Sequence, residues 1–209
     1  MLRPAGDLFI VSSPSGAGKT TLIRRILADP AFAGSIHFSV SHTTRAARPG
    51  EVHGREYYFV TAGEFESLAA RDGFLEHATY DGNRYGTSRG EVESRLAAGM
   101  DVLLDIDVQG ARQVRSRMPD VVKVFVFPPS REVLETRLRN RGHNTPESIA
   151  RRLAAAAREM GEFGEYDYAI INDVLDAAVD ELRSIVVARR SSRRRRQERL
   201  ESILRTFPA

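Results

Sequence analysis

Residues 12–21, with the sequence SSPSGAGKTT, have the residue types and spacing of a loop that binds phosphate groups. In such a loop, backbone N–H groups at the start of a helix point at the phosphates, a lysine reaches the outer phosphates, and the next hydroxyl helps to hold Mg²⁺. Gly16, Gly18, Lys19 and Thr20 supply this set. Ser13 stands where the strict pattern G-x-x-x-x-G-K-[ST] begins with glycine, so the match loses specificity but no charged or metal-binding group.

The scarcity of lysine supports the same interpretation. Lys19 and Lys123 are the only lysines among 31 lysine and arginine residues. A chain that otherwise uses arginine has kept lysine where a compact ammonium group must enter between phosphates. We therefore favour nucleotide phosphate binding over the alternative, a glycine-rich turn with a purely structural role.

The elements predicted around the loop are those that a phosphate loop needs. The apolar run 8–12 predicts a strand before it, and Leu22, Ile23, Ile26 and Leu27 follow it at helical spacing. Further buried strands are predicted at 101–107, 121–127 and 166–172, with helices between them that include 108–117 and 131–141. Strands that alternate with helices predict an α/β fold with a parallel sheet covered on both faces.

Two segments interrupt this pattern. Residues 36–90 are rich in glycine, threonine, tyrosine and histidine, with short strand-like pieces around one short helix, which predicts an inserted lobe of mixed α and β structure. Residues 137–163 carry many arginines and a helix start at the sequence TPES, which predicts a second insertion. The core is then formed by residues 1–35, 91–136 and 164–209.

Three longer blocks carry a family resemblance: SVSHTTRAARPGEVHGREYYF from residue 39, FLEHATYDGNRYGTS from residue 74, and LLDIDVQGA from residue 103. With them the sequence, from residue 8 to about 188, resembles the guanylate kinases, which transfer the γ-phosphoryl group of ATP to GMP. The resemblance implies a P-loop NTPase-type three-layer core with a parallel sheet, a GMP-binding lobe at 36–90 and a helical lid at 137–163.

The inserted lobe holds residue types suited to the phosphate of GMP. Arg45 and Arg48, in the basic segment TTRAAR, carry planar guanidinium groups that make bidentate contacts to phosphate. Tyr57 and Tyr85 have hydroxyls that donate hydrogen bonds, and the resemblance implies that they bind the same phosphate.

Guanine differs from adenine at the edge that it offers to a protein. A carboxylate facing its N1–H and 2-amino donors, with a hydroxyl facing O6, reads guanine and repels adenine. The resemblance places Glu76 at the two donors and Ser41 and Thr87 near O6.

Asp105 and Asp107 close a hydrophobic run at the expected carboxyl edge of the sheet, where open α/β folds bind ligands. The resemblance favours Asp105 as a contributor near Mg²⁺ and GMP and leaves Asp107 less certain. We expect Mg²⁺ on the Thr20 hydroxyl, with Asp105 acting through water. The resemblance also implies that ATP contacts Asn172 beside its adenine and the loop residues Ser15, Gly16, Ala17, Gly18, Lys19, Thr20 and Thr21.

Phosphoryl transfer requires position and positive charge around the transferred group and no covalent nucleophile. By the family pattern, Arg137, Arg141 and Arg152 converge on the ATP phosphates when the lid closes and excludes water. We expect the catalytic set to comprise these arginines together with Lys19, Arg45 and Asp105.

The composition excludes several other classes of protein. With 209 residues and 42% hydrophobic side chains, the chain can bury one core with insertions, and the lack of cysteine excludes disulfides, thiolate zinc sites and cysteine nucleophiles. No run of about 18 apolar residues and no secretory signal pattern occurs, so we expect no membrane association and a cytoplasmic location. The five histidines show no metal-ligand spacing.

The arginine-rich segment 188–200 is compatible with a helix, and we interpret it as a solvated helical face; nucleic-acid binding is not expected despite the basic cluster. Two rival functions stay open: a guanylate-kinase-like module that binds proteins, and a ribose-bisphosphate kinase of similar fold. Glu76, Ser41 and Thr87 argue against a sugar phosphate, which offers no guanine edge. Arg84 and Val174 depart from the family pattern, and the sequence does not reveal the oligomeric state.

Overall fold

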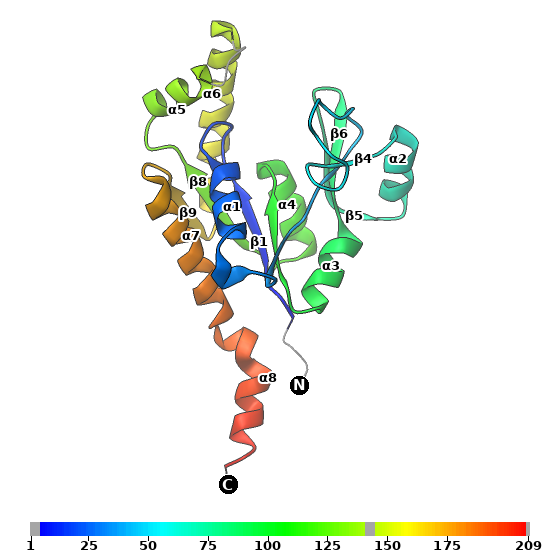
Figure 1. Cartoon of the computed structure of the whole chain (residues 1–209), viewed down its shortest axis with the longest axis vertical. Helices are drawn as coiled ribbons and strands as arrows, with labels where there is room; N and C mark the ends of the chain where they lie inside the picture. The colour runs from blue at the N-terminus through cyan, green and yellow to red at the C-terminus, as the bar shows by residue number, and fades with distance from the viewer. Residues whose placement is uncertain (1–4, 141–144, 208–209) are drawn as a thin grey trace.

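A five-stranded parallel sheet forms the centre of the molecule (Figure 1). The structure, a computed structural model, describes residues 5–140 and 145–207. The strand order is β2-β7-β1-β8-β9, and every neighbouring pair is parallel. The predicted α/β class with a parallel sheet is confirmed. The bounds of these strands are β1 Leu8–Ser12, β2 Ile36–Phe38, β7 Asp101–Asp105, β8 Val122–Phe127 and β9 Tyr168–Ile171.

Helices cover both faces of this sheet because side chains along a strand point alternately to opposite faces. Phe9 and Val11 of β1 pack into one apolar cluster with α1 and α7, and Leu8 and Ile10 pack into another with α3 and α4. The central strands are therefore buried on both faces. The bounds of these helices are α1 Lys19–Leu27, α3 Arg89–Ala97, α4 Val108–Arg117 and α7 Leu175–Arg190, with a short 3₁₀ turn, η1, at Pro30–Phe32.

A second, four-stranded sheet lies beside the core, on the right in Figure 1, in the order β4-β3-β6-β5. Strands β5 and β6 form an antiparallel hairpin whose turn residues Asp81 and Gly82 have φ of 48° and 72°. Thr61 begins α2 with a capping box that Glu64 completes. The bounds are β3 His42–Thr43, β4 Tyr58–Phe59, α2 Ala62–Ala70, β5 Phe74–Tyr80 and β6 Asn83–Ser88.

Two paired helices, α5 (Arg131–Arg139) and α6 (Pro146–Gly161), lie at the top of Figure 1. They share a small apolar cluster around Leu134, Leu138 and Ala156. Thr145 caps α6 and Pro146 occupies its first turn, as the sequence TPES predicts. A 3₁₀ turn, η2, at Phe163–Glu165 leads from α6 back to β9.

Strand β2 corrects one predicted boundary. Residues 36–38 pair with β7 in the core sheet, so the inserted lobe cannot begin at residue 36. The strand forms here because Ile36 and Phe38 pack against the core cluster that holds Phe9 and Val11. The division into core, lobe and lid stays a prediction, and the predicted start of the lid at residue 137 falls within α5. Within the described ranges, no helix has the length and apolarity that a membrane crossing requires.

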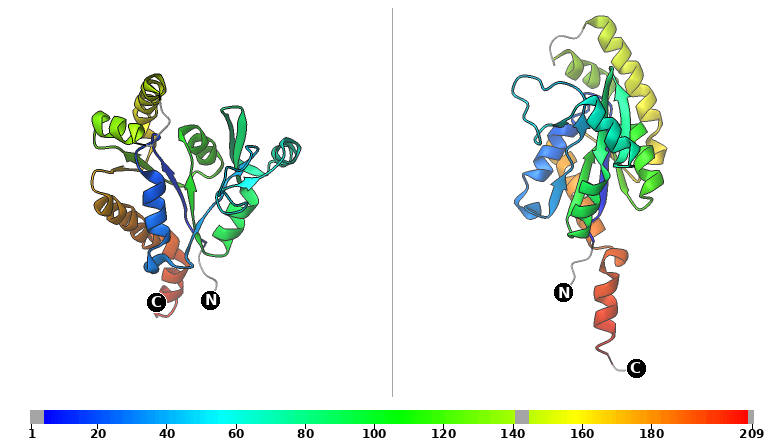
Figure 2. Two further views of the ribbon diagram at one scale, coloured as in Figure 1. Left: turned by 45° about the horizontal axis from the view of Figure 1, so that its top comes forward. Right: turned by 90° about the vertical axis from the view of Figure 1, so that its right-hand side faces the viewer.

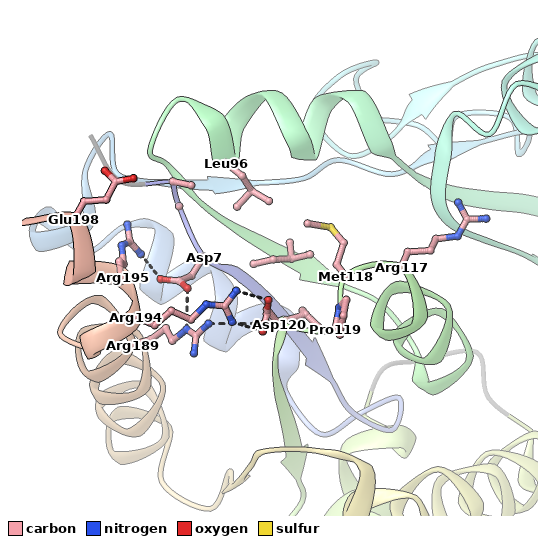
Figure 3. A pocket seen from close by; sticks show the side chains of 14 residues that line it. Asp7, Leu96, Arg117, Met118, Pro119, Asp120, Arg189, Arg194, Arg195 and Glu198 are labelled. Atoms are coloured by element: carbon pink, nitrogen blue, oxygen red, sulfur yellow. Dashed lines mark hydrogen bonds and ion pairs between the residues drawn. The ribbon is translucent and has the colours of Figure 1, made fainter. Parts of the chain in front are cut away.

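The arginine-rich segment closes the amino-terminal edge of the core sheet. Asp101, at the start of β7, has no exposed surface, and it pairs with Arg190, at 2.7 Å, and with Arg195. Arg189 and Arg195 also pair with Asp7, which precedes β1. Asp7, Arg189 and Arg195 line a pocket of about 450 Å³, in which Figure 3 shows Arg195 and Arg189 turned toward Asp7.

The interpretation of residues 188–200 as a solvated face is therefore wrong for Arg189, Arg190 and Arg195. A buried carboxylate needs a charged partner. Asp101 pairs with Arg190 and Arg195, and Asp7 pairs with Arg189, so all three arginines turn inward. Arg194 fits the solvated description better, because its pair with Asp120 is exposed. The final helix, α8 (Arg193–Leu204), extends away from both insertions (Figures 1 and 2).

Candidate active site

The loop after β1 has the backbone that phosphate binding requires. Gly16 and Gly18 have φ of 99° and 95°, a region that favours glycine. Ser13 does not have a positive φ. In the described part of the chain, the non-glycine residues with positive φ are Asp72 and Asp81. The serine thus fits its position without the conformational freedom of the glycine that the strict pattern places there.

Gly18 is required for a second reason. Asn172, just after β9, is buried, and its Nδ2 donates a hydrogen bond of 2.7 Å to the carbonyl oxygen of Ala17. A Cβ atom on Gly18 would lie 2.2 Å from that Nδ2. Arg137 of α5 donates to the carbonyl oxygen of Asn172 at 3.0 Å and to that of Ala17 at 3.5 Å. Both residues therefore contact the loop itself, and the predicted place of Asn172 beside adenine stays a prediction.

Lys19 is the first residue of α1, and its ammonium group lies at the carboxyl edge of the sheet. It forms an ion pair with Asp105, the last residue of β7, and its Nζ is 3.4 Å from the carbonyl oxygen of Ile106. Ser12 donates to the same carbonyl at 2.8 Å. Of the other predicted ATP contacts, Ser15, Thr20 and Thr21 are exposed at the loop and the first turn of α1.

Five of the eight residues predicted to bind the acceptor line one pocket. Its volume is about 310 Å³, at the small end of the range for small-molecule sites. Ser41, Tyr57, Glu76, Tyr85 and Asp105 all line it, and Asp105 is the residue that pairs with Lys19. The loop and the pocket therefore meet at one carboxylate. Sequence reasoning did not assign the remaining lining residues Ala78, Tyr80 and Ile106, and left Asp107 uncertain.

Glu76 is a buried carboxyl at the wall of this pocket. Burial, more than the nearby charge of Asp107, raises its pKa from 4.5 to about 7, against the opposing effect of a hydrogen bond from Thr87. That bond joins Thr87 Oγ1 to Glu76 Oε1 at 2.6 Å. A Cβ atom on Gly110 of α4 would lie 3.0 Å from Glu76 Oε2, so a glycine there makes room for the carboxylate. Thr87 thus contacts Glu76 and is not among the residues that line the pocket.

Arg45 lies beside the pocket and is held by a residue that sequence reasoning missed. Glu51 accepts two hydrogen bonds from its guanidinium group, at 2.8 and 2.9 Å, and this contact raises the pKa of Arg45. The same guanidinium lies 5.4 Å from the ring centre of Tyr57. Arg48 is exposed, and its backbone N–H donates to Glu51 at 2.7 Å. The structure does not bring either arginine into the pocket lining.

The paired helices α5 and α6 carry charged side chains of both signs. Arg152 lies half-buried on α6, and Arg141 lies outside the described residues. Glu159, also on α6, has a raised pKa because it is partly buried and faces Asp107. Asp107 itself caps α4 by accepting a hydrogen bond of 2.8 Å from the N–H of Gly110. This cap gives Asp107 a structural role beside its place in the pocket wall.

The groups near Lys19 fit Mg²⁺ but form no complete metal cage. The described residues contain no group of three or more histidine, cysteine, aspartate or glutamate side chains that could hold a metal ion. Mg²⁺ keeps several waters and uses one or two protein oxygens together with substrate phosphates. Thr20, exposed on the first turn of α1, and Asp105 are oxygen donors of that kind.

A phosphate loop at the carboxyl edge of a parallel sheet, facing a second polar pocket, defines a phosphate-loop enzyme that brings two small substrates together. Comparison with known proteins narrows this class. Residues 5–189 match the family model described as guanylate kinase. The chain therefore belongs to the guanylate kinase family.

Individual relatives agree. The chain is 49% identical to the guanylate kinases of Salmonella paratyphi A and Escherichia coli K12, over 95% of its own length and 96% of theirs. It is also similar to the crystal structure of guanylate kinase from Anaplasma phagocytophilum, with 35% identity and a TM-score of 0.73. That match covers 92% of this chain and 90% of the other. These relatives leave the protein-binding module and the ribose-bisphosphate kinase without support.

Proposed function

We propose that this chain transfers the γ-phosphoryl group of ATP to GMP, giving ADP and GDP, with the donor bound at the loop and the acceptor in the pocket beside it. One observation carries the proposal beyond the family name. Asp105 both lines the acceptor pocket and pairs with Lys19 of the loop, so the two substrates would meet where these side chains meet.

ATP is held mainly by backbone groups in this proposal. The N–H groups of the loop and of the first turn of α1 cradle its phosphates, and Lys19 leaves Asp105 to reach the outer ones. Mg²⁺, when bound, neutralises the charge that develops on the transferred group. Thr20 would hold it directly and Asp105 through water. Asn172 supports the loop and, through it, the adenine side of the site.

GMP is recognised at both of its ends. Glu76 accepts hydrogen bonds from N1–H and the 2-amino group, and Ser41 and Thr87 serve O6. At the other end, Arg45 and Arg48 close on the phosphate, since guanidinium groups pair with phosphate in a bidentate way. Tyr57 and Tyr85 add hydroxyl donors; their rings are already in contact, 5.8 Å apart between centroids.

The transfer itself needs position and positive charge around the moving group. Arg137 is already at the loop, and Arg141 and Arg152 would join it when the α5–α6 lid closes and excludes water. The three-part division into core, GMP lobe and lid follows from these roles. This division and a cytoplasmic location both stay predictions.

A coupled assay of ADP release tests the proposal directly. ATP and Mg²⁺ are supplied with GMP, AMP, CMP, UMP or ribose 1,5-bisphosphate as parallel acceptors. We expect rapid turnover with GMP and at least about 10⁴-fold lower kcat/KM with the other bases, because a site built to hydrogen-bond one edge rejects analogues that lack it. Turnover with the sugar phosphate, or nucleotide binding without turnover on any acceptor, would instead support one of the two rival functions.

A further inference from the structure

Strand β5, which carries Glu76, lies at the edge of its sheet. It pairs with β6 on one side, and in the strand order β4-β3-β6-β5 no strand from the described residues lies on its other side. An edge strand presents backbone N–H and C=O groups that need partners. Here side chains of α4, a helix of the core, supply them.

Gln113 of α4 takes the place of a neighbouring strand at the centre of this edge. Its Oε1 accepts a hydrogen bond of 3.1 Å from the N–H of His77, and its Nε2 donates one of 3.1 Å to the carbonyl oxygen of the same residue. One amide side chain thus satisfies both backbone groups of the residue that directly follows Glu76.

Arg117, one turn further along α4, does the same at the start of the strand. It donates to the carbonyl oxygen of Phe74 at 2.9 Å and to the carboxylate of Asp72 at 2.6 Å. Glu76 is therefore flanked by two anchored positions, residues 74 and 77. The register of β5 against β6 also shifts between Phe74 and Glu76, so pairing with β6 alone sets this stretch less firmly than regular pairing would.

The third contact of α4 with β5 is between Gly110 and the side chain of Glu76. Gly110, Gln113 and Arg117 lie at i, i+3 and i+7, a spacing that puts them on one face of a helix. Glu76 packs over Gly110, whose missing Cβ leaves room for the carboxylate. The adjacent face of α4 is fixed in the core, where Ala111 and Val114 pack with Leu8 and Ile10 of β1.

We propose that Gln113 is a positioning residue for guanine recognition: its double hydrogen bond to residue 77 fixes Glu76 against the core so that the carboxylate faces N1–H and the 2-amino group. This rests on the proposed function. Gln113 contacts no substrate in this arrangement and acts only through β5. Arg45 and Arg48, which we propose bind the phosphate, lie on a different segment, residues 45–58, and Glu51 of that segment holds them.

The test compares Gln113→Leu with Gln197→Leu, a matched substitution of an exposed glutamine on α8. His77 is exposed, so water replaces the lost hydrogen bonds and the fold is kept, which a thermal melt checks. We expect Gln113→Leu to raise KM for GMP about tenfold, the effect of two modest hydrogen bonds. The GMP-over-AMP ratio of kcat/KM should fall by a similar factor, with KM for ATP within about twofold of wild type. Gln197→Leu should leave all three unchanged.

Gln113→Glu adds a graded variant, because it keeps the acceptor for the His77 N–H and loses the donor to the carbonyl. The KM of Gln113→Glu for GMP should lie between those of wild type and Gln113→Leu. If Gln113→Leu does not fold, a rise in the KM of Gln113→Glu for GMP supports the inference and an unchanged KM contradicts it. An unchanged KM for GMP, or equal rises in KM for GMP and ATP, would overturn the inference. A wild-type protein that does not phosphorylate GMP would overturn the proposed function instead, before any variant is made.

Discussion

The two halves of the site are built in different ways. The donor side is a single stretch of ten residues, shaped by glycines at positive φ and braced from behind by Asn172 and Arg137. The acceptor side is assembled from side chains spread between residues 41 and 107, on two sheets and the loops between them. The loop is therefore preorganised by its backbone, whereas the pocket depends on how separate elements are held together.

This difference extends within the acceptor pocket. The wall that we propose to read the base is buried and anchored to α4, and Glu76 is bonded to Thr87. The proposed phosphate side lies beside the pocket, at Arg45, which is held by Glu51 within the same loop. Substitutions in the part anchored to the core should change rate or selectivity strongly, and substitutions in the part held only within its own loop should change KM slightly.

The largest effect is expected at the loop. Lys19→Met removes the ammonium group that we propose reaches the transferred phosphate, and we expect kcat to fall about 10³-fold or more. Binding of GMP, measured by calorimetry, should stay within a few-fold of wild type, because Lys19 is not among the residues that line the pocket. Lys123→Met is the matched control: that lysine donates to the carbonyl of Glu165, near η2, and its loss should leave kcat nearly unchanged. An equal loss of GMP binding in Lys19→Met would refute this division between donor and acceptor sides.

The next effect is on selectivity. Glu76→Gln replaces a charged acceptor by an amide that presents a donor to the donors of guanine. The GMP-over-AMP ratio of kcat/KM should fall about 100-fold, since hydrogen bonds to charged groups are the stronger ones. KM for ATP should not change. If selectivity survives, the pocket reads guanine with some other group.

Glu76 also makes the stability of the unliganded protein depend on pH. Its folded pKa of about 7 lies above the ordinary value of 4.5, so the folded state binds the proton more tightly than the unfolded state does. This contribution is fully present below about pH 4.5 and is lost as the pH rises through 7. The free energy of unfolding of wild type, relative to Glu76→Gln, should therefore fall by about 2 kcal/mol between pH 5 and pH 8.

Urea denaturation of both proteins at the two pH values measures this difference. The comparison isolates Glu76 because carboxylates with lowered pKa values, such as Asp72 and Asp120, titrate alike in both proteins. A difference between the two proteins that stays constant with pH would show that Glu76 is ionised throughout this range in the folded state.

The smallest effect is expected on the phosphate side. Glu51→Ala leaves Arg45 without its bidentate partner, and we expect KM for GMP to rise two- to fivefold with kcat nearly unchanged, as is typical of partly exposed ion pairs. Glu56→Ala is the control from the same segment, because Glu56 pairs with Arg55 and the N–H of Val52 instead. A tenfold or larger change in kcat for Glu51→Ala would group Arg45 with the part of the site anchored to the core.

The sequence predicted these two sides unequally well. The loop is local, so Gly16, Gly18 and Lys19 could be identified from their spacing alone, and Asp105 from its place at the end of a buried strand. The family resemblance supplied Glu76, Tyr57 and Tyr85, which now line one pocket. Glu51, Gly110 and Gln113 carry no such signal, because their partners lie elsewhere in the chain and only the folded arrangement brings them together.

The same limit explains two errors. Strand β2 is too short to stand out from the lobe that follows it, and its pairing with β7 depends on residues far along the chain. The arginines of segment 188–200 follow no pattern that separates inward from outward positions. Arg195 pairs with Asp101, and the buried partner decides its direction.

That last pairing has a consequence for how the protein is made. Asp101 leaves the ribosome long before Arg190 and Arg195, and Arg195 lies beyond residue 189, where the family match ends. The buried carboxylate of Asp101, at the start of β7, stays without its arginine partners until Arg190 and Arg195 are translated. A chain terminated before Arg190 would contain every proposed catalytic group. It would nevertheless leave Asp101, at the start of β7, without its arginine partners, and this part of the fold would be open to proteases. A version trimmed to residue 189, the family boundary, lacks Arg190 and Arg195 and should be degraded faster in cells than the chain that carries both arginines.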